Sequence, residues 1–140
     1  MDLIRSRLRI IATGDQGRGL QAAQNFKEGD IIESAPVLVI PIPNYIELKT
    51  NEHLKCIWAR TFTWVPDDNK YRTVGAIVHG YMTMCNHSDT PNAQLNKVYD
   101  NEMMELKATM DISEGDMITI KYNNTNLINI KDWYDGKSAN

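Results

Sequence analysis

The chain has little cysteine, no long apolar run and no signal-peptide pattern, and each absence excludes a class of protein. Its two cysteines, Cys56 and Cys85, lie far apart, which argues against a disulfide framework and a cysteine-rich zinc site. The longest apolar run, Val37–Ile40, is far too short to cross a bilayer. The basic residues near the N-terminus are not followed by an apolar segment. We therefore expect an intracellular protein, cytoplasmic or nuclear, with no membrane partner.

An excess of positive charge is also missing. The chain has 15 Lys and Arg against 18 Asp and Glu, a net charge of −3. Proteins that grip nucleic-acid phosphates carry a basic surplus, so we expect no direct contact with nucleic acid. A basic peptide remains an acceptable partner. The 140 residues, 42% of them hydrophobic, predict one domain, residues 1–140, that buries roughly two-thirds of its unfolded surface.

Short apolar runs separated by turn residues dominate the sequence, a rhythm typical of a mainly β protein. Pro41 and Pro43 end the strand that begins at Ile31, because proline cannot donate a hydrogen bond to a sheet. One helix is expected over residues 44–55. The expected strands cover residues 8–12, 20–26, 31–40, 57–65, 94–99, 102–110 and 117–122, with a hairpin turn at 100–101.

Two stretches of the chain echo each other. Residues 26–32 and 112–118 both begin with an apolar residue and continue through Glu-Gly-Asp into an expected strand. The simplest interpretation is a pair of similar turns. Gly29 and Gly115 are then expected to have positive φ, which glycine adopts at low steric cost.

A glycine-rich loop, Gly14–Gly19, is the first segment that could bind a ligand. Glycines let the backbone approach a ligand closely, and their N–H groups can hold an anion. The spacing is not that of a dinucleotide fingerprint, and the Gly-Lys-Ser/Thr of a phosphate loop is missing. By itself the loop predicts a tight turn.

A polar block, Asn86–Asn92, reads Asn-His-Ser-Asp-Thr-Pro-Asn. It places side-chain donors and acceptors in a row beside an apolar run. Such a cluster predicts a backbone segment that side chains hold in place where no regular ladder exists.

A metal site is the alternative interpretation of this part of the chain. On a continuous strand, residues at odd positions face one way, and here these are His79, Cys85, His87 and Asp89. Gly80 and Pro91 argue against a continuous strand, so a structural role is favoured and no metal is expected.

Aromatic residues near the C-terminus complete the candidates. Tyr122 ends the last expected strand, where a phenol can reach the mouth of a cleft, although a half-buried structural tyrosine is the simpler reading. Trp133 and Tyr134 stand in a polar tail, and such isolated aromatics either fold back onto a groove or anchor the terminus.

Taken in order, these pieces resemble a SET domain, the fold of protein lysine methyltransferases. The resemblance rests on Gly17–Gly19, Asn86–Asn92, the turn Glu114–Asp116 and Tyr122, and it spans about residues 8–134. The Asn86–Asn92 block is a specific motif. The other three motifs support the resemblance mainly through their order and spacing. The chain looks most similar to the short stand-alone SET proteins of viruses and bacteria, which lack flanking histone-reader domains.

The resemblance implies a β-clip fold of several small sheets and short helices, with a knot-like C-terminal threading and a core over about residues 8–122. S-adenosyl-L-methionine would bind one face, and the ε-amine of a protein lysine would enter from the opposite face through a narrow channel. The tail, residues 123–140, would close the cofactor site, with Trp133 or else Tyr134 over the adenine. The implied cofactor-binding residues are Gln16, Gly17, Arg18, Gly19, Asn86, His87 and Trp133.

The same resemblance makes Tyr122 the catalytic residue, which orients the amine and the sulfonium, and places Tyr81 and Ile120 along the substrate channel. Two positions depart from the family pattern. Lys121 stands where many relatives carry Asp, and Ile120 stands where Phe or Tyr often tunes the number of methyl groups added. The zinc segment of many nuclear members is absent, so no zinc is implied.

The function that this resemblance implies is S-adenosyl-L-methionine-dependent methylation of a lysine in a protein substrate, such as a histone or another basic protein. The alternative is a catalytically inactive SET-fold module that binds a peptide or partner. A metal-dependent hydrolase is the third reading. Met and Trp side chains, if exposed, are compatible with a homodimer.

Overall fold

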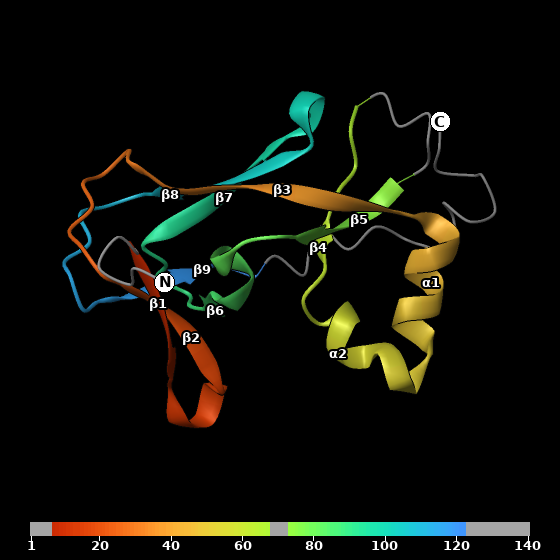
Figure 1. The fold of residues 1–140 in the computed structure, drawn as a ribbon, viewed down its shortest axis with the longest axis horizontal. Helices are drawn as coiled ribbons and strands as arrows, with labels where there is room; N and C mark the ends of the chain where they lie inside the picture. Colours follow the sequence, from red (N-terminus) through yellow and green to blue (C-terminus); the bar gives the residue numbers. More distant parts are fainter. Residues whose placement is uncertain (1–6, 68–72, 123–140) are drawn as a thin grey trace, which may run out of the picture.

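The computed structural model describes residues 7–67 and 73–122, which form two small β-sheets and several short helical turns (Figure 1). The first sheet has the strand order β1-β2-β9-β6, and the second has the order β4-β5-β3-β8-β7. The strands of the first sheet are β1 (Leu8–Ala12), β2 (Arg18–Ala22), β9 (Met117–Ile120) and β6 (Asn86–His87). Those of the second are β4 (Phe62–Thr63), β5 (Thr73–Val78), β3 (Ile31–Pro41), β8 (Met103–Ala108) and β7 (Ala93–Val98). The expected mainly β architecture is confirmed.

The glycine-rich loop closes an antiparallel hairpin of β1 and β2. It contains a 3₁₀ turn, η2 (Gly14–Gln16), and Gly14 and Gly17 have φ of +76° and +74°. The backbone N–H and the side-chain hydroxyl of Thr13 both donate to the Gly17 carbonyl at 2.7 Å. The loop is therefore the tight turn that the sequence predicts, and its glycines are needed for its backbone conformation.

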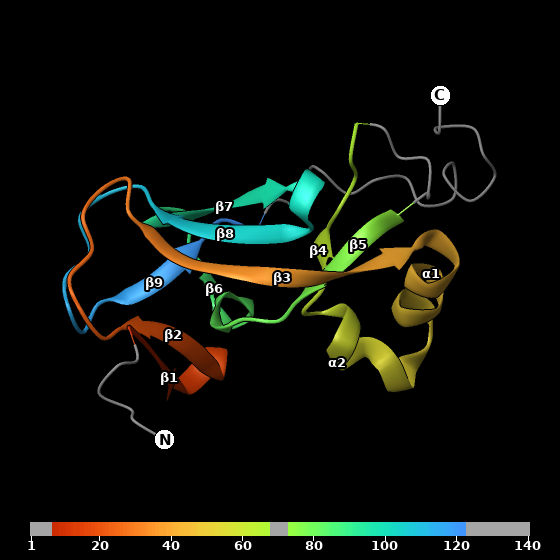
Figure 2. The ribbon, with the colours of Figure 1, turned by 45° about the horizontal axis from the view of Figure 1, so that its top comes forward.

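β3 is the centre of the second sheet and pairs with β5 on one edge and β8 on the other (Figure 2). Buried Ala35 and Val37 alternate with exposed Pro36 and Leu38, as expected for a strand with one face on the core. The register with β8 shifts between Ile31 and Glu33. This bulge re-aims the side chains near the start of the strand.

The helical part of the fold follows β3 directly and lies at one end of the molecule in Figure 1. It consists of α1 (Ile42–Thr50), η3 (Glu52–Leu54) and α2 (Lys55–Trp58), so the helix expected over residues 44–55 starts earlier and is broken. Pro43 is tolerated because the N–H groups of the first helical turn have no intrahelical acceptor. The N–H that proline lacks therefore costs the helix no hydrogen bond.

The strand expected over residues 57–65 is wrong for most of its length. α2 takes its first residues, and only β4 is strand. Trp58 packs with the buried cluster of Ile40, Ile42 and Tyr45 next to α1. The alternating aromatic pattern is thus satisfied by a short helix followed by an extended segment, because packing against α1 overrides the local pattern.

The two Glu-Gly-Asp turns are confirmed, with Gly29 and Gly115 at φ of +91° and +93°. In each turn the aspartate accepts a hydrogen bond from the backbone N–H three residues earlier, at 2.8 and 3.0 Å. The apolar residues ahead of the turns, Phe26 and Ile112, exchange two backbone hydrogen bonds of 2.8 Å. The repeated sequence therefore builds two equivalent turns that pair with each other.

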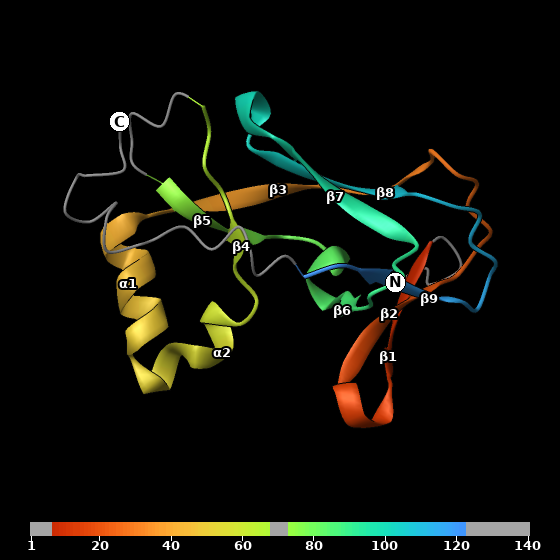
Figure 3. The ribbon, with the colours of Figure 1, turned by 180° about the vertical axis from the view of Figure 1, so that it is seen from behind.

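β9 lies between β2 and β6, antiparallel to the first and parallel to the second (Figure 3). A 3₁₀ turn, η4 (Tyr81–Met84), leads into β6, and another, η5 (Tyr99–Asn101), joins β7 to β8 as the expected hairpin turn. Segments from the beginning, the middle and the end of the described chain thus meet in one sheet. Among the described residues no helix is long and apolar enough to span a bilayer. The largest fully buried side chains are Trp64, Phe26, Leu20, Ile32, Ile42 and Met82.

Candidate active site

The glycine-rich loop and the polar block meet at Gly19 and Asn86. A Cβ atom on Gly19 would lie 2.7 Å from Nδ2 of Asn86 and 2.8 Å from Cε of Met117. Only glycine leaves room for this approach, since real Cβ contacts are not that short. Asn86 is the buried polar residue of the described core, with 8% of the residue exposed. A largely buried amide close to glycine backbone is suited to hold a polar ligand.

The end of the polar block is held to β9 by side-chain hydrogen bonds. Asn92 donates from Nδ2 to the Met117 carbonyl at 2.8 Å and accepts from the Thr119 N–H at Oδ1 at 2.9 Å. The Ser88 N–H donates to the Ile120 carbonyl at 2.9 Å. The amide of Asn92 thus imitates a neighbouring strand, and the predicted pinning of this backbone by side chains is confirmed.

Tyr122 follows β9 and is connected to the polar block at His87 and to Cys85 directly before it. Its phenol donates a hydrogen bond to the Cys85 carbonyl at 2.6 Å, and its backbone N–H donates to Nδ1 of His87 at 2.9 Å. The His87 and Tyr122 rings lie 5.4 Å apart between centroids. The phenol is therefore fixed in position, although 45% of the residue is exposed.

The hydrogen bonds of His87 define its tautomer. Nδ1 accepts a hydrogen bond from Tyr122 and so carries no proton in this arrangement. Nε2 lies 3.0 Å from Oδ1 of Asp89, which a protonated Nε2 can reach as a donor. Tyr122 and Asp89 therefore hold the imidazole with Nδ1 as the acceptor and Nε2 as the donor.

Burial keeps the Tyr122 phenol and the Cys85 thiol protonated. Burial raises the pKa of Tyr122, against a smaller lowering by the Arg60 guanidinium. Burial, with a contribution from the Glu33 carboxylate, raises the pKa of the Cys85 thiol to about 12. At neutral pH the phenol is therefore a hydrogen-bonding group rather than a base, and Cys85 is not an activated nucleophile.

Glu33 is a positioning residue that sequence reasoning missed. Its carboxylate accepts from the backbone N–H groups of Tyr81 and Met82 at 2.9 and 2.8 Å, at the start of η4. A Cβ on Gly80 would lie 2.8 Å from this carboxylate. The available signal was the pair of polar residues, Glu33 and Ser34, that interrupts the alternation of β3 at its bulge.

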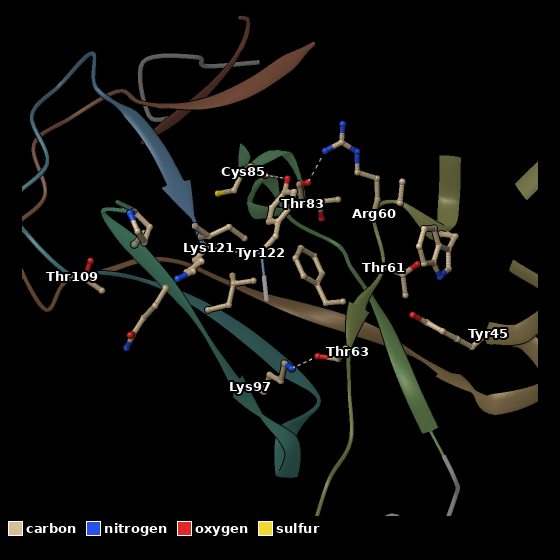
Figure 4. A pocket seen from close by; sticks show the side chains of 18 residues that line it. Tyr45, Arg60, Thr61, Thr63, Thr83, Cys85, Lys97, Thr109, Lys121 and Tyr122 are labelled. Carbon is tan, nitrogen blue, oxygen red and sulfur yellow. Dashed lines mark hydrogen bonds between the residues drawn. The ribbon is translucent and has the colours of Figure 1, made fainter. Parts of the chain in front are cut away.

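A cavity of about 700 Å³ opens beside Tyr122, between β7 and the segment that contains β4 (Figure 4). Part of its wall is apolar, with Trp58, Phe62, Leu95 and Ile120. The indole N–H of Trp58 is buried and finds no acceptor among the residues that the structure describes. The cavity is large enough for side chains of a peptide, and its wall includes the phenol.

The cavity contains only part of the predicted site. Of the predicted residues, Ile120 and Tyr122 line it. Gln16, Gly17 and Arg18 are exposed in the hairpin loop and at the start of β2, while Gly19, Asn86 and His87 lie in the first sheet. Tyr81 is 42% exposed at the start of η4 and does not line the cavity. Trp133 and Tyr134 lie outside the described residues.

The charge of the cavity wall is one-sided, which the sequence did not indicate. Arg60, Lys97 and Lys121 line the cavity, and none of its described lining residues is Asp or Glu. Lys97 donates from Nζ to Oγ1 of Thr63 at 2.6 Å, and burial lowers its pKa. Arg60 donates to the Thr83 carbonyl at 3.4 Å.

The alternative of a metal site on one strand face is not supported by the backbone. η4 interrupts the chain between His79 and Cys85, and His87 uses both ring nitrogens for other contacts. Within residues 7–67 and 73–122, no three His, Cys, Asp or Glu side chains are grouped so that they could hold a metal ion.

Comparison with known proteins identifies the fold family. The SET domain profile matches residues 17–123. A Plasmodium falciparum protein described as a candidate histone methyltransferase is 23% identical with a TM-score of 0.61, over 86% of this chain and 96% of that one. The Neurospora SET domain protein DIM-5, a histone lysine methyltransferase, is 20% identical with a TM-score of 0.63, over 84% of this chain and 52% of DIM-5.

The chain therefore spans about half the length of DIM-5. No curated protein sequence matches it. At these identities the structural likenesses show a shared fold, and the family profile covers most of the chain. The chain belongs to the SET-domain family.

Proposed function

We propose that the protein is an S-adenosyl-L-methionine-dependent protein-lysine methyltransferase and that Tyr122 orients the reacting amine. The observation that carries this proposal is the position of the phenol. It is hydrogen-bonded to the Cys85 carbonyl at 2.6 Å, lines the cavity, and follows the strand that pairs with Asn86–His87. One group is thus connected both to a cavity for a substrate and to the segment where glycine backbone and a buried amide meet.

The cofactor side of the proposed site is the face formed by Gly17–Gly19 and Asn86–His87. Its open backbone at Gly17 and the largely buried amide of Asn86 fit the polar groups of a nucleoside and an amino acid. Gln16 and Arg18 are exposed beside it. When bound, the cofactor supplies a methyl group that its sulfonium has already activated. We propose that the whole chain is one domain; residues 123–140, including Trp133, for which the resemblance implies the covering of this side, lie outside the described residues.

The task of the cavity is to deliver a neutral amine. Lowering a lysine pKa from about 10.4 to about 7 costs roughly 4 to 5 kcal/mol. Apolar walls at Phe62 and Ile120 disfavour an ammonium ion, and so does the positive charge of Arg60. These residues therefore favour loss of the proton as the substrate lysine enters.

Tyr122 then fixes the direction of the amine. Its O–H donates a hydrogen bond to the Cys85 carbonyl. The lone pairs of the phenol oxygen can therefore accept a hydrogen bond from an amine N–H. Because burial raises its pKa, the phenol keeps its proton and is not the base. Holding the nitrogen in line with the methyl carbon supplies several kcal/mol of the barrier reduction.

A catalytically inactive SET-fold module is the second candidate function. The observation that favours it is Lys121, which places a positive charge next to the proposed catalytic tyrosine. A third cation on the cavity wall, beside Arg60 and Lys97, opposes the entry of a lysine that is still charged.

A transfer assay separates the two functions. The protein is incubated with labelled S-adenosyl-L-methionine and a mixed pool of lysine-rich proteins, and modified lysines are mapped by mass spectrometry. Calorimetry measures cofactor binding independently. We expect cofactor binding together with label on lysine. Binding without label would support the inactive module, and absence of both would overturn the proposal.

A further inference from the structure

The cavity beside Tyr122 concentrates positive charge in a chain that is acidic overall. Its wall carries Arg60, Lys97 and Lys121, whereas the whole sequence has a net charge of −3. Across residues 7–67 and 73–122, the ion pairs are Arg9–Glu114 and His87–Asp89, and neither involves a cation of the cavity. The local excess therefore does not follow from composition.

The cations of the cavity keep unused hydrogen-bonding capacity. The ammonium group of Lys97 has three N–H donors, and one of them donates a hydrogen bond to the Thr63 hydroxyl. Arg60 has five donors, of which one makes a long contact of 3.4 Å to the Thr83 carbonyl. Burial of Lys97 without a carboxylate lowers its pKa, so a negative charge brought into the cavity would be favoured there.

Lys121 places one of these charges at the reacting end of the cavity. It directly precedes Tyr122, whereas Lys97 and Thr63 lie on β7 and β4 (Figure 4). A segment that reaches Tyr122 through the cavity therefore meets positive charge along its path. Arginine or lysine neighbours of the target lysine would meet like charge, which is unfavourable.

We propose that the substrate segment carries Asp or Glu within about two residues of its target lysine. The distance follows from an extended chain, which advances about 3.3 Å per residue, and from a screening length of about 8 Å at physiological salt. This inference rests on the proposed methyltransferase function and narrows it from any lysine-bearing protein to one with an acidic target segment.

The test uses three synthetic peptides of equal length with one lysine, flanked on both sides by Glu, by Gln or by Arg. Both kcat/KM for methyl transfer and peptide Kd by fluorescence anisotropy are measured. We expect the Glu peptide to have a kcat/KM about fivefold higher and a Kd about fivefold lower than the Gln peptide, the factor that corresponds to about 1 kcal/mol for a charge pair. The Arg peptide is expected to have a lower kcat/KM and a higher Kd than the Gln peptide. The preference should shrink at high salt.

The matched variants are Lys97→Glu and Lys27→Glu. Lys97 lines the cavity, whereas the Lys27 side chain is exposed in the first Glu-Gly-Asp turn and lies outside the cavity, so the two variants change the net charge equally. Lys97→Glu should shift the preference toward the Arg peptide, and Lys27→Glu should leave it unchanged. Lys97→Gln, with thermal melting of each variant, provides a neutral version if the reversed charge unfolds the protein.

The outcomes separate this inference from the proposed function. Methylation with equal or better use of the Arg peptide overturns the acidic preference and leaves the methyltransferase standing. Preferential binding of the Glu peptide without transfer supports the preference and overturns the activity. If Lys97→Glu weakens cofactor binding but not peptide binding, the charge serves the cofactor and the inference is wrong.

Discussion

The backbone N–H of Tyr122 donates a hydrogen bond to Nδ1 of His87 at 2.9 Å. This contact ties the last described residue of the chain to the polar block 35 positions earlier. It also requires that Nδ1 carry no proton, while Nε2 faces Asp89. The imidazole therefore sets the position at which the chain leaves β9, and with it the direction of the phenol.

Replacing Tyr122 by Phe removes the hydroxyl and leaves the ring. We expect kcat to fall about a hundredfold, because the amine loses the group that aligns it. Cofactor Kd should change less than about twofold, since the phenol donates to Cys85 rather than to the glycine loop. The free energy of unfolding should fall by about 1 kcal/mol for the lost hydrogen bond. Steady-state kinetics and calorimetry measure these effects, and wild-type turnover would contradict the role of Tyr122.

Gly19→Ala tests whether the contact with Asn86 supports cofactor binding. The new Cβ would lie 2.7 Å from Nδ2 of Asn86, so the amide must move. We expect cofactor affinity to fall at least about tenfold, roughly the effect of one lost hydrogen bond to a charged group. Gly29→Ala is the control, because it strains a φ of +91° but meets no atom within 4 Å. It should lower stability and leave cofactor affinity unchanged, and equal affinity losses in both variants would contradict the prediction.

Asn92→Ala should destabilise the fold without changing the chemistry directly. It leaves the Met117 carbonyl and the Thr119 N–H without their side-chain partner, at a cost of about 1–3 kcal/mol each. Asn44→Ala, on an exposed position of α1, is the matched control and should cost less than about 1 kcal/mol. Urea denaturation of the two variants measures the difference. A similar stability loss in both would show that Asn92 does not hold β9.

Stability should fall in alkaline solution because of Cys85. The thiol has a pKa of about 12 in the folded chain against 9.0 when unperturbed, so only the unfolded chain loses the proton between these values. The unfolded state then binds fewer protons, and the free energy of unfolding decreases by about 1.4 kcal/mol per pH unit above pH 9. Below pH 9 the thiol is protonated in both states, so the stability that depends on the protonated thiol is fully present. Tyr122 adds to the decrease at higher pH, while Lys97, whose pKa burial lowers, opposes it.

The Cys85→Ala variant isolates this contribution. Denaturant melts at pH 8, 9 and 10 give the slope of stability against pH for both proteins. We expect the wild type to lose more stability than the variant between pH 9 and 10. Parallel curves would show that the thiol ionises alike in the folded and unfolded chains.

Much of the fold can be predicted from local sequence. The Glu-Gly-Asp turns, the hairpin turn at Asp100–Asn101 and most strands follow from turn chemistry and apolar alternation, and both turn glycines have the expected positive φ. The strand expected over residues 57–65 is wrong because Trp58 packs against the cluster of Ile40, Ile42 and Tyr45, which is distant from it in sequence. Local pattern does not encode such packing.

The sequence by itself determined which residue types were available to the site: a glycine loop, the Asn86–Asn92 block and a tyrosine at a strand end. Only the tertiary structure decided that Gly19 lies against Asn86, that Glu33 holds the start of η4, and that Arg60 and Lys97 share one cavity wall. The physical reason is that hydrogen bonds and charge interactions depend on distances in space. Gly19 and Asn86, for example, lie close together because β9 pairs with both β2 and β6.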